Sequence, residues 1–529
     1  MSDTPGIALV GLPGTGKSVI GRLLAERLGR ELCDTDQLIE QAAGRSVPEI
    51  LELDGESRFR ELERDALLRA CASPGSVIAT GGGALNDPLN RWALRRHGIL
   101  VWLQAPVDLL ARRLEADDVP RPLLQGDRAG RLTTLLAERS PFYRAADAWV
   151  DATRKPVEVV NELAKRSVGA ASTGRLFDGE VQRQHPIGPA TGRVVLGVDM
   201  SRAVYDEILE REAVILADRR AARAAPQLLA ALPAGPRLEI RAGERAKRLR
   251  RLEETLEWMA DQRIERGTTV VAFGGGTLGD LAGLAAALYT RGLPLVQVPT
   301  TWLAQVDASI GGKVAVDLSA GKNMAGAFWP PVAVISDLAA VRSLPRARLR
   351  EGMTEAIKAA LIGDPVLFAL IERRGVEALR GAEEERYAIT ERAVRVKLGI
   401  VDRDPFETGE RRHLNLGHTI GHALEVASGY RLAHGAAVAI GLRGAATLAA
   451  IRGGDADLPA RLDRLFARLG YRPGLNLDPG RVRAALGLDK KRERGRQRWI
   501  LPMAIGQTVE VDDVSEAELA VALRAIGLD

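Results

Sequence analysis

The stretch Gly11-Leu12-Pro13-Gly14-Thr15-Gly16-Lys17-Ser18 decides the fold of the first third of the chain. It matches the pattern G-x-x-x-x-G-K-[ST] in full, follows the apolar run Gly6–Val10 and precedes a helical pattern that extends to Leu28. The glycines let backbone N–H groups turn inward around phosphate oxygens, and the following helix adds its positive N-terminal end. The alternative is a glycine-rich turn that binds nothing, and the strand–loop–helix context argues against it. We therefore predict an ATP site formed by Gly14, Thr15, Gly16, Lys17 and Ser18, with Ser18 ligating Mg²⁺.

Strand-like and helical stretches alternate from this motif to about Leu163, which is typical of a parallel sheet with helices on both faces. The clearest strands are Val77–Thr80 and Ile99–Leu103. The following residues, 167–192, are rich in Gly, Ser, Thr, Pro and Gln without periodicity, which predicts a linker.

A second alternating segment follows the linker, with predicted strands at Ala213–Ala217, Thr269–Phe273 and Leu295–Val298. From Pro345 onward the pattern is mostly helical. The predicted fold class is α/β: a P-loop domain with a three-layer parallel sheet, a Rossmann-like α/β part and a mainly α-helical part. The predicted boundaries are 1–166, 167–192 for the linker, 193–338 and 339–529.

Composition excludes several classes of protein. Of 529 residues, 46% are hydrophobic and 27% are charged, and only two are cysteines, so a disulfide scaffold is not expected. No apolar run approaches the roughly 18 residues of a membrane span, and no signal peptide is visible, so we expect a cytoplasmic protein without membrane partners. The net charge is +5 and 4% of residues are aromatic, with no basic stripe. Small-molecule substrates are therefore expected, and nucleic acid is not.

Several residues around the P-loop motif suggest what accepts the phosphate. Cys33-Asp34-Thr35-Asp36 ends a predicted second strand, and its two carboxylates could serve the metal shell and the acceptor hydroxyl. Three arginines could bind a carboxylate or a phosphate: Arg60, Arg121 and Arg139. The triplet Gly81-Gly82-Gly83 permits close approach of the backbone to a ligand.

Together these motifs closely resemble the shikimate kinase family over residues 5–166. The resemblance implies MgATP-dependent phosphorylation of the shikimate 3-hydroxyl. It implies that Lys17, Asp36 and Arg121 are catalytic and that Thr35 and Arg121 join the ATP site. It also places Asp34 near Mg²⁺ and assigns shikimate binding to Asp36, Arg60, Gly82 and Arg139.

In the second half, the strand Thr269–Phe273 leads into Gly274-Gly275-Gly276-Thr277-Leu278-Gly279-Asp280. This matches G-x-G-x-x-G, which alone is weak evidence for a dinucleotide. No acid follows at the usual distance of about 20 residues. Asp218 ends an earlier strand and could bind ribose instead, so the nucleotide hypothesis survives without a standard dehydrogenase fold.

Four of the six histidines fall between His413 and His434. His418 and His422 are spaced i, i+4 on one helical face, and His434 follows 12 residues later. Thr419 replaces the glutamate of a metalloprotease motif. With Glu355, two histidines would form a site for Zn²⁺ acting as a Lewis acid. Only ten of the 74 basic residues are lysines, and six of those ten lie beyond residue 300: Lys313, Lys322, Lys358, Lys397, Lys490 and Lys491. Such a ring of cations suits a phosphate and a carboxylate.

These segments closely resemble the 3-dehydroquinate synthase family over residues 193–525. The resemblance implies conversion of 3-deoxy-D-arabino-heptulosonate 7-phosphate to 3-dehydroquinate with NAD and Zn²⁺ or Co²⁺, in a homodimer formed through this half. It implies metal ligands Glu355, His418 and His434. It implies a substrate site with seven residues that are also catalytic: Asp307, Lys313, Lys358, Lys397, Arg411, Asn415 and His422. Three further residues would bind the substrate without a catalytic role: Asn323, Lys490 and Arg291. Arg291 would reach the site of a neighbouring subunit. It implies NAD contacts from Asp218, Glu244, Lys247, Gly275, Gly276, Asp280, Thr300, Thr301 and Lys322.

Two positions depart from the family pattern. Ala436 stands where glutamate is common, and Val314-Ala315-Val316-Asp317 stands where Thr-Gly-Val-Asn is usual. Loss of an acid beside a metal ligand could retune the metal. Two alternatives for this half follow: a related cyclase acting on another sugar phosphate, or a catalytically dead regulatory module.

Overall fold

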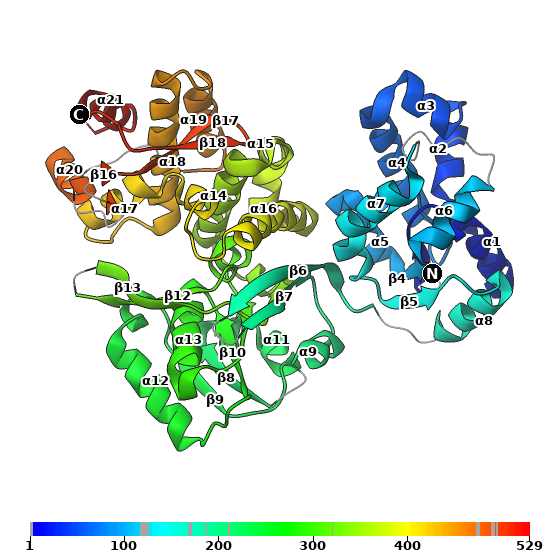
Figure 1. Cartoon of the computed structure of the whole chain (residues 1–529), viewed down its shortest axis with the longest axis horizontal. Coiled ribbons are helices and arrows are strands. Elements are labelled where there is room, and N and C mark those ends of the chain that lie inside the picture. Colours follow the sequence, from blue (N-terminus) through cyan, green and yellow to red (C-terminus); the bar gives the residue numbers. More distant parts are fainter. Residues whose placement is uncertain are drawn as a thin grey trace. The chain divides into compact units, whose positions relative to one another are not determined.

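The computed structural model describes residues 4–116, 126–167, 172–185, 188–209, 212–319, 321–471, 477–487, 492–493 and 496–528. The chain forms two compact units, the first comprising residues 1–180 and 195–204 and the second 181–194 and 205–529. Figure 1 shows the elements of both units in chain order.

The first unit is built on a five-stranded sheet of order β2-β3-β1-β4-β5, in which every neighbouring pair of strands is parallel. The predicted strand before the P-loop is confirmed as β1 at the centre of this sheet. The elements are β1 Gly6–Val10, α1 Lys17–Leu28, β2 Leu32–Asp34, α2 Thr35–Ala43, α3 Val47–Leu53, α4 Gly55–Cys71, β3 Val77–Ala79, η1 Ala84–Asn86, α5 Pro88–His97, β4 Gly98–Gln104, α6 Val107–Glu115, α7 Arg128–Tyr143, β5 Ala148–Asp151 and α8 Pro156–Ser167.

Two apolar clusters hold this unit together. In the larger, Ile20 and Leu24 of α1 and Val159 and Leu163 of α8 cover one face of the sheet, and the two helices lie side by side in Figure 1. The smaller joins α2, α3 and α4 through buried Ile39, Ile50, Phe59 and Ala66. This helical cluster fixes α2 and α4 beside the ends of β2 and β3, which positions the predicted acceptor site.

The predicted linker is wrong for much of its length. Residues 175–185 and 188–197 form strands β6 (Arg175–His185) and β7 (Gly188–Gly197), which join the sheet of the second unit. Leu176 and Phe177 are buried and Phe177 contacts Phe142. The polar composition hid these strands because their stability comes from pairing with a neighbouring strand and not from local periodicity.

The second unit begins with a seven-stranded sheet of order β6-β7-β14-β11-β10-β8-β9, with parallel pairing from β14 to β9. Its elements are α9 Arg202–Ile208, β8 Ala213–Asp218, α10 Arg219–Ala224, α11 Pro226–Ala231, β9 Arg237–Ile240, η3 Glu244–Ala246, α12 Leu249–Asp261, β10 Thr269–Gly274, α13 Gly276–Leu288, η4 Tyr289–Arg291, β11 Leu295–Pro299, the π-helical turn η5 Ala304–Ala308, β12 Lys313–Leu318, β13 Gly321–Phe328, β14 Ala333–Asp337 and η6 Leu338–Val341.

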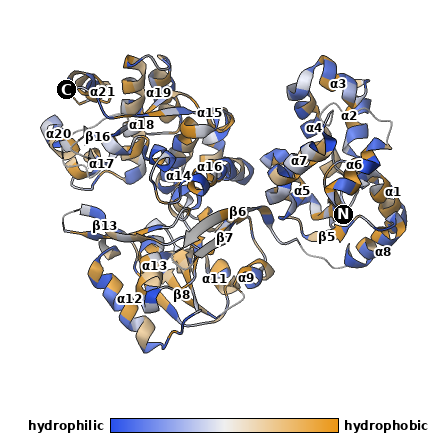
Figure 2. Cartoon of the chain, in the orientation of Figure 1, coloured by the Kyte–Doolittle hydropathy of each residue, from blue (hydrophilic) through white to orange (hydrophobic). Residues whose placement is uncertain are grey.

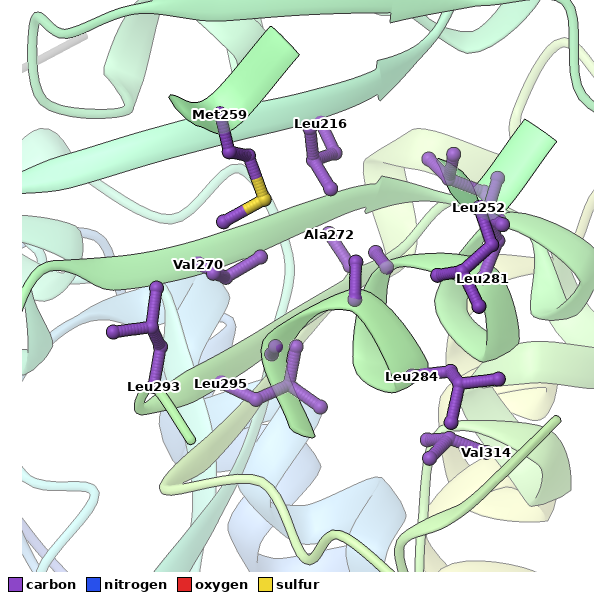
Figure 3. Packing of buried hydrophobic residues seen from close by; sticks show 14 of the residues in the cluster. Leu216, Leu252, Met259, Val270, Ala272, Leu281, Leu284, Leu293, Leu295 and Val314 are labelled. Atoms are coloured by element: carbon purple, nitrogen blue, oxygen red, sulfur yellow. The ribbon is translucent and has the colours of Figure 1, made fainter. Parts of the chain in front are cut away.

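The core of this sheet lies between β8, β10 and β11 and the helices α12 and α13. Figure 3 shows the side chains pointing toward one another, among them Leu252 and Met259 from α12, Leu281 and Leu284 from α13, and Val270 from β10. Figure 2 shows the hydropathy pattern behind this packing: α12 carries both hydrophobic and hydrophilic residues, whereas β8 is hydrophobic. The strands are buried on both faces, as expected for a parallel sheet.

The rest of the second unit is mainly helical, as predicted. Its elements are α14 Arg346–Gly363, α15 Pro365–Arg380, α16 Glu383–Arg403, η7 Glu410–Asn415, α17 His418–Ala427, α18 His434–Ile451, α19 Leu458–Arg468, α20 Pro479–Gly487, β15 Arg492–Glu493, β16 Arg496–Gln497, β17 Trp499–Ala504, β18 Gln507–Val511 and α21 Glu516–Ala525. Among the described helices, α18 alone is long and apolar enough to cross a membrane, and 67% of it is buried inside the structure. It packs against α14, α17 and α21, as a core helix does.

Candidate active sites

The P-loop connects the end of β1 to the start of α1. Gly14 and Gly16 have φ angles of 84° and 85°, which side chains with a Cβ rarely adopt. Helix α1 begins at Lys17 without a side-chain cap, so its first N–H groups are available to an anion. Lys17 Nζ donates to the carbonyl oxygens of Gly11 and Leu12, at 3.0 Å each. Ser18 is exposed beside it. The loop therefore has the shape and charge of a phosphate cradle.

The aspartates after β2 have different surroundings. Asp34 is buried and caps α2, because its Oδ1 accepts from the backbone N–H of Asp36 at 3.1 Å. Asp36 is exposed, and a Cβ built on Gly81 would lie 3.0 Å from its Oδ1. Thr35, predicted in the ATP site, is fully buried and its Oγ1 accepts from Gly81 N–H at 2.8 Å. Thr35 thus supports the glycine turn, and Asp36 faces it.

Two arginines lie against the same glycine turn. Arg139 is buried and its Nη1 donates to the carbonyl oxygen of Gly82 at 2.6 Å. A Cβ on Gly83 would lie 2.4 Å from Arg60 Nη1, so only glycine leaves room for that guanidinium. The structure thus brings Asp36, Arg60, Gly82 and Arg139 together. Arg121 lies outside the described residues.

Glu63 belongs to this site, and sequence analysis missed it. It is buried, and its Oε2 accepts from Arg60 Nη1 at 2.7 Å. Burial raises the pKa of Glu63, and the charge of Arg60 opposes that rise. The available signal was its spacing, because Glu63 lies three residues after Arg60 on the same face of α4.

In the second unit, three helices bring the predicted metal ligands together. Glu355 comes from the middle of α14, His418 from the first turn of α17 and His434 from the first turn of α18. Glu355 Oε1 lies 3.9 Å from His418 Nε2 and 3.4 Å from His434 Nε2. One ligand atom from each lies within 4.8 Å of the others, and the same is true of His422, Glu425 and His434.

The residues of the first group fit a divalent metal. Both oxygens of the Glu355 carboxylate are buried and accept no hydrogen bond, although Lys358 Nζ lies 2.6 Å from Oε2 as an ion-pair partner. His418 Nδ1 lies 3.1 Å from the carbonyl oxygen of Leu416, which leaves Nε2 to face Glu355. Two imidazoles and one carboxylate suit Zn²⁺ or Co²⁺ in a site with an open position.

A cluster of opposite charges lies next to the metal ligands. Lys358 Nζ is 3.0 Å from Asp307 Oδ2, and Lys397 contacts the other oxygen of the same carboxylate. Although burial opposes it, the two ammonium groups hold the pKa of Asp307 well below its usual range. Burial lowers the pKa of Lys397 to about 8. Lys397 is therefore the buried cation of this cluster that can exchange a proton near neutral pH.

Three more predicted substrate residues converge around an acid that sequence analysis missed. Glu407 lies 2.5 Å from Lys313 Nζ and accepts from Asn415 Nδ2 at 2.9 Å. Its φ of 60° is unusual for a residue with a side chain. Arg411 is buried and donates to the carbonyl oxygens of Gly311, at 2.7 Å, and Pro405. Glu407 lies in an irregular turn, where no periodic pattern marks it.

The predicted NAD residues surround the turn between β10 and α13. A Cβ on Gly275 would lie 2.9 Å from Thr301 Cγ2, so the backbone approaches its neighbours closely there. Lys247 is buried and contacts Asp280 and Asn323, a residue predicted to bind substrate. Burial raises the pKa of Asp280 to about 6, and Lys247 opposes that rise. A cation thus links the predicted NAD and substrate residues.

The remaining predicted residues make fewer contacts with the groups described above. Thr300 N–H donates to Gly274, and Asp218 caps α10 by accepting from Arg220 N–H at 2.9 Å. Glu244 lies in η3, 3.2 Å from Lys322 Nζ. Arg291 is exposed in η4 with a φ of 69°. Lys490 lies outside the described residues.

Comparisons with known proteins match both units. Residues 13–167 match the family Shikimate kinase, and residues 237–351 and 352–492 match the N-terminal and C-terminal families of 3-dehydroquinate synthase. The 3-dehydroquinate synthase of Symbiobacterium thermophilum is 39% identical over 364 residues, covering 68% of this chain and 96% of that protein. The 2-epi-valiolone synthase of Actinosynnema mirum is 40% identical, covering 61% and 89%. The solved structure of ValA, a 2-epi-5-epi-valiolone synthase from Streptomyces hygroscopicus with NAD⁺ and Zn²⁺ bound, is 30% identical with a TM-score of 0.60, covering 65% and 99%.

Proposed function

Because the chain belongs to the 3-dehydroquinate synthase family and carries a shikimate kinase domain before it, we propose that it catalyses two steps of the shikimate pathway. The first unit phosphorylates shikimate with MgATP. The second converts 3-deoxy-D-arabino-heptulosonate 7-phosphate to 3-dehydroquinate and phosphate. The observation that carries the second proposal is the juxtaposition of Glu355, His418 and His434 with the charged cluster around Asp307.

In the first unit, each side chain has a distinct task. Lys17 leaves its two backbone carbonyls to contact the transferred phosphoryl group, and Ser18 joins the Mg²⁺ that accompanies ATP. Asp36 accepts the proton of the substrate hydroxyl, and Arg60 and Arg139 bind the substrate carboxylate. Arg121 and the backbone of Gly82 complete the site in this proposal.

In the second unit, Glu355, His418 and His434 would hold a divalent metal, which polarises a substrate oxygen when bound. NAD, when bound at Gly275, Gly276 and Lys322, supplies reversible hydride transfer. The reaction has no net redox change, so the cofactor is regenerated in each turnover.

The chain's own residues bind and orient the sugar phosphate. Lys313, Arg411 and Asn415 supply donors for its anionic groups, and Glu407 holds two of these donors in place. Asp307 fixes Lys358 and Lys397 at the metal ligands, and Lys397, with its pKa near 8, exchanges a proton with substrate oxygen. We further propose Zn²⁺ as the metal, a homodimer formed through this unit, and a cytoplasmic location.

The test of the second activity uses purified full chain with NAD⁺, Zn²⁺ and 3-deoxy-D-arabino-heptulosonate 7-phosphate, without ATP. We expect release of phosphate together with 3-dehydroquinate, and loss of both on chelation of the metal or in His418→Ala. Kinase activity, measured with shikimate and MgATP, should persist in His418→Ala because that residue lies in the other unit.

A second candidate for this unit is a cyclase acting on another sugar phosphate. The 40% identity to a 2-epi-valiolone synthase favours it, as do Ala436 and the unusual stretch Val314–Asp317. Turnover of another seven-carbon sugar phosphate without turnover of the heptulosonate would establish this alternative. Absence of turnover on either substrate, with bound metal and NAD, would indicate a dead regulatory module.

Replacing Glu63 with glutamine is expected to weaken the acceptor site of the kinase. The neutral amide no longer holds Arg60 by an ion pair, so the KM for shikimate should rise roughly tenfold, about 1.4 kcal/mol of binding, with a smaller fall in kcat. The KM for ATP should not change. Steady-state kinetics with each substrate varied in turn check this, and Glu61→Gln, which removes an exposed carboxylate from the same helix, is the matched control.

A further inference from the structure

Glu425 lies between the metal ligands and the NAD residues, and none of the roles above includes it. It occupies α17, one turn after His422, and is buried. Its Oε2 lies 3.4 Å from Nδ1 of His434, and its Oε1 lies 3.2 Å from Nζ of Lys322. One carboxylate therefore serves a metal-ligand histidine with one oxygen and a lysine of β13 with the other.

Lys322 extends this contact to the nucleotide side. Its Nζ also lies 3.2 Å from Glu244 Oε1 in η3 and 4.8 Å from the ring centre of Tyr430. Lys322 is assigned to NAD in the proposed function, and the family resemblance implies the same role for Glu244. A continuous path of contacts thus runs from the metal ligand His434 through Glu425 and Lys322 to Glu244.

The chemistry of this path is that of an outer-shell carboxylate. A histidine that binds a metal through Nε2 is oriented when its Nδ1–H donates to a carboxylate, and loss of that partner weakens metal binding roughly 10- to 100-fold. His434 presents Nε2 to Glu355 and Nδ1 to Glu425, as this role requires. The position after Gly435 is Ala436, so no acid is supplied there. A buried carboxylate also needs a cation, and Lys322 provides it.

We propose that Glu425 is a positioning residue for the metal site, and that through Lys322 it makes metal affinity and NAD affinity depend on each other. NAD bound at Glu244 and Lys322 holds the lysine in place, which keeps Glu425 oriented toward His434. The first ligand thus orders groups that the second ligand needs, so the coupling is favourable. Because coupling between two binding equilibria is reciprocal, metal tightens NAD binding by the same factor. This inference rests on the proposed function for the location of NAD.

The experiment measures binding and does not depend on turnover. The full chain, freed of metal with a chelator, is titrated with Co²⁺ by its visible absorption, with and without saturating NAD⁺. NAD⁺ binding is titrated by calorimetry, with and without Co²⁺. We expect NAD⁺ to tighten Co²⁺ binding by about fivefold or more, with the same factor in the reverse titration.

Glu425→Gln keeps the shape of the side chain and removes its charge. We expect Co²⁺ binding in this variant to weaken roughly 10- to 100-fold with an unchanged absorption spectrum, and the coupling factor to fall below about twofold. The control is Glu351→Gln, which removes a carboxylate one turn before Glu355 on α14. Glu351 pairs with Arg348 at 2.8 Å and a Cβ on Gly435 would lie 3.0 Å from its Cβ, so it lies near the site without an ion pair to a histidine. This control should retain both affinities and the coupling.

Lys322→Gln tests the other end of the path. We expect it to weaken NAD⁺ binding and to remove the coupling, while Co²⁺ still binds and gives the wild-type spectrum. Coupling that persists in either variant would overturn the inference. Glu425 lies close enough to His422 and His434 to be a direct metal ligand. If the Co²⁺ absorption spectrum of Glu425→Gln changes in the same way as that of Glu355→Gln, Glu425 is a direct ligand and the positioning role is overturned.

Failure of the proposed function gives a different result. If the wild-type chain binds neither Co²⁺ nor NAD⁺, the assignment of the second unit itself is wrong. If it binds both without mutual effect, the proposed function stands and the inference about Glu425 is rejected.

Discussion

Kinase activity is expected to fall by a factor of about 10²–10³ when Lys17 is replaced by methionine. The ammonium group is the side-chain cation of the P-loop, and it stabilises the charge that develops on the transferred phosphoryl group. Lys17→Arg should be nearly as damaging, because the two carbonyl oxygens that hold the ammonium, each at 3.0 Å, offer a compact socket and not a planar one. Initial rates with shikimate and MgATP measure both variants.

A control variant and a second activity test whether the effect of Lys17→Met is specific to the P-loop. Lys165→Met is the matched control, since it makes the same chemical change at an exposed position on α8 of the same unit, and it should keep full kinase activity. Conversion of the heptulosonate phosphate by Lys17→Met should equal that of the wild type, because the residue lies in the first unit. Kinase activity in Lys17→Met within a factor of three of wild type would contradict the assignment of the P-loop.

The sequence predicted the sheet strands well where they are apolar on both faces. The runs Gly6–Val10, Ala213–Ala217 and Thr269–Phe273 became β1, β8 and β10 with bounds that differ by at most one residue. Their burial in parallel sheets requires an unbroken apolar run, and such a run is visible without knowledge of the partner strand. Strands β6 and β7 were missed for the opposite reason, because polar residues dominate β6 and the other neighbour of β7 in the sheet is the distant strand β14.

The candidate sites divide in the same way. Lys17, His418 and His434 could be found because their chemistry imposes a spacing or a rare residue type on the sequence. Three acids were missed: Glu63, Glu407 and Glu425. Each lies against a lysine or an arginine, and only Glu63 is close in sequence to its partner, so tertiary structure alone reveals the others. Acids are common in this chain, and a single one carries no signal until its partner is known.

Lys358→Met is expected to have the largest effect on stability. The Lys358 side chain is 4% exposed and lies between two carboxylates, with Nζ 2.6 Å from Glu355 and 3.0 Å from Asp307. Although burial opposes it, these carboxylates raise the pKa of Lys358, so it is charged in the folded chain. Removing the cation leaves the buried Glu355 and the partly buried Asp307 with less compensation, and breaking a buried ion pair typically costs about 3–5 kcal/mol. Urea unfolding of the second unit, followed by circular dichroism with the metal removed, measures this loss.

A double-mutant cycle separates the ion pair from loss of packing. Glu355→Gln with Lys358→Met removes one acid together with the cation, so the double variant should recover part of the stability that Lys358→Met loses. Lys313→Met is the control for removing a lysine from the same site: its side chain is 48% exposed and pairs with Glu407, so we expect a loss below about 1 kcal/mol. A loss in Lys358→Met no larger than that of Lys313→Met would show that Lys358 does not stabilise the buried acids. The lysine would then serve binding alone, and the two carboxylates would have to be held by the metal and by Lys397.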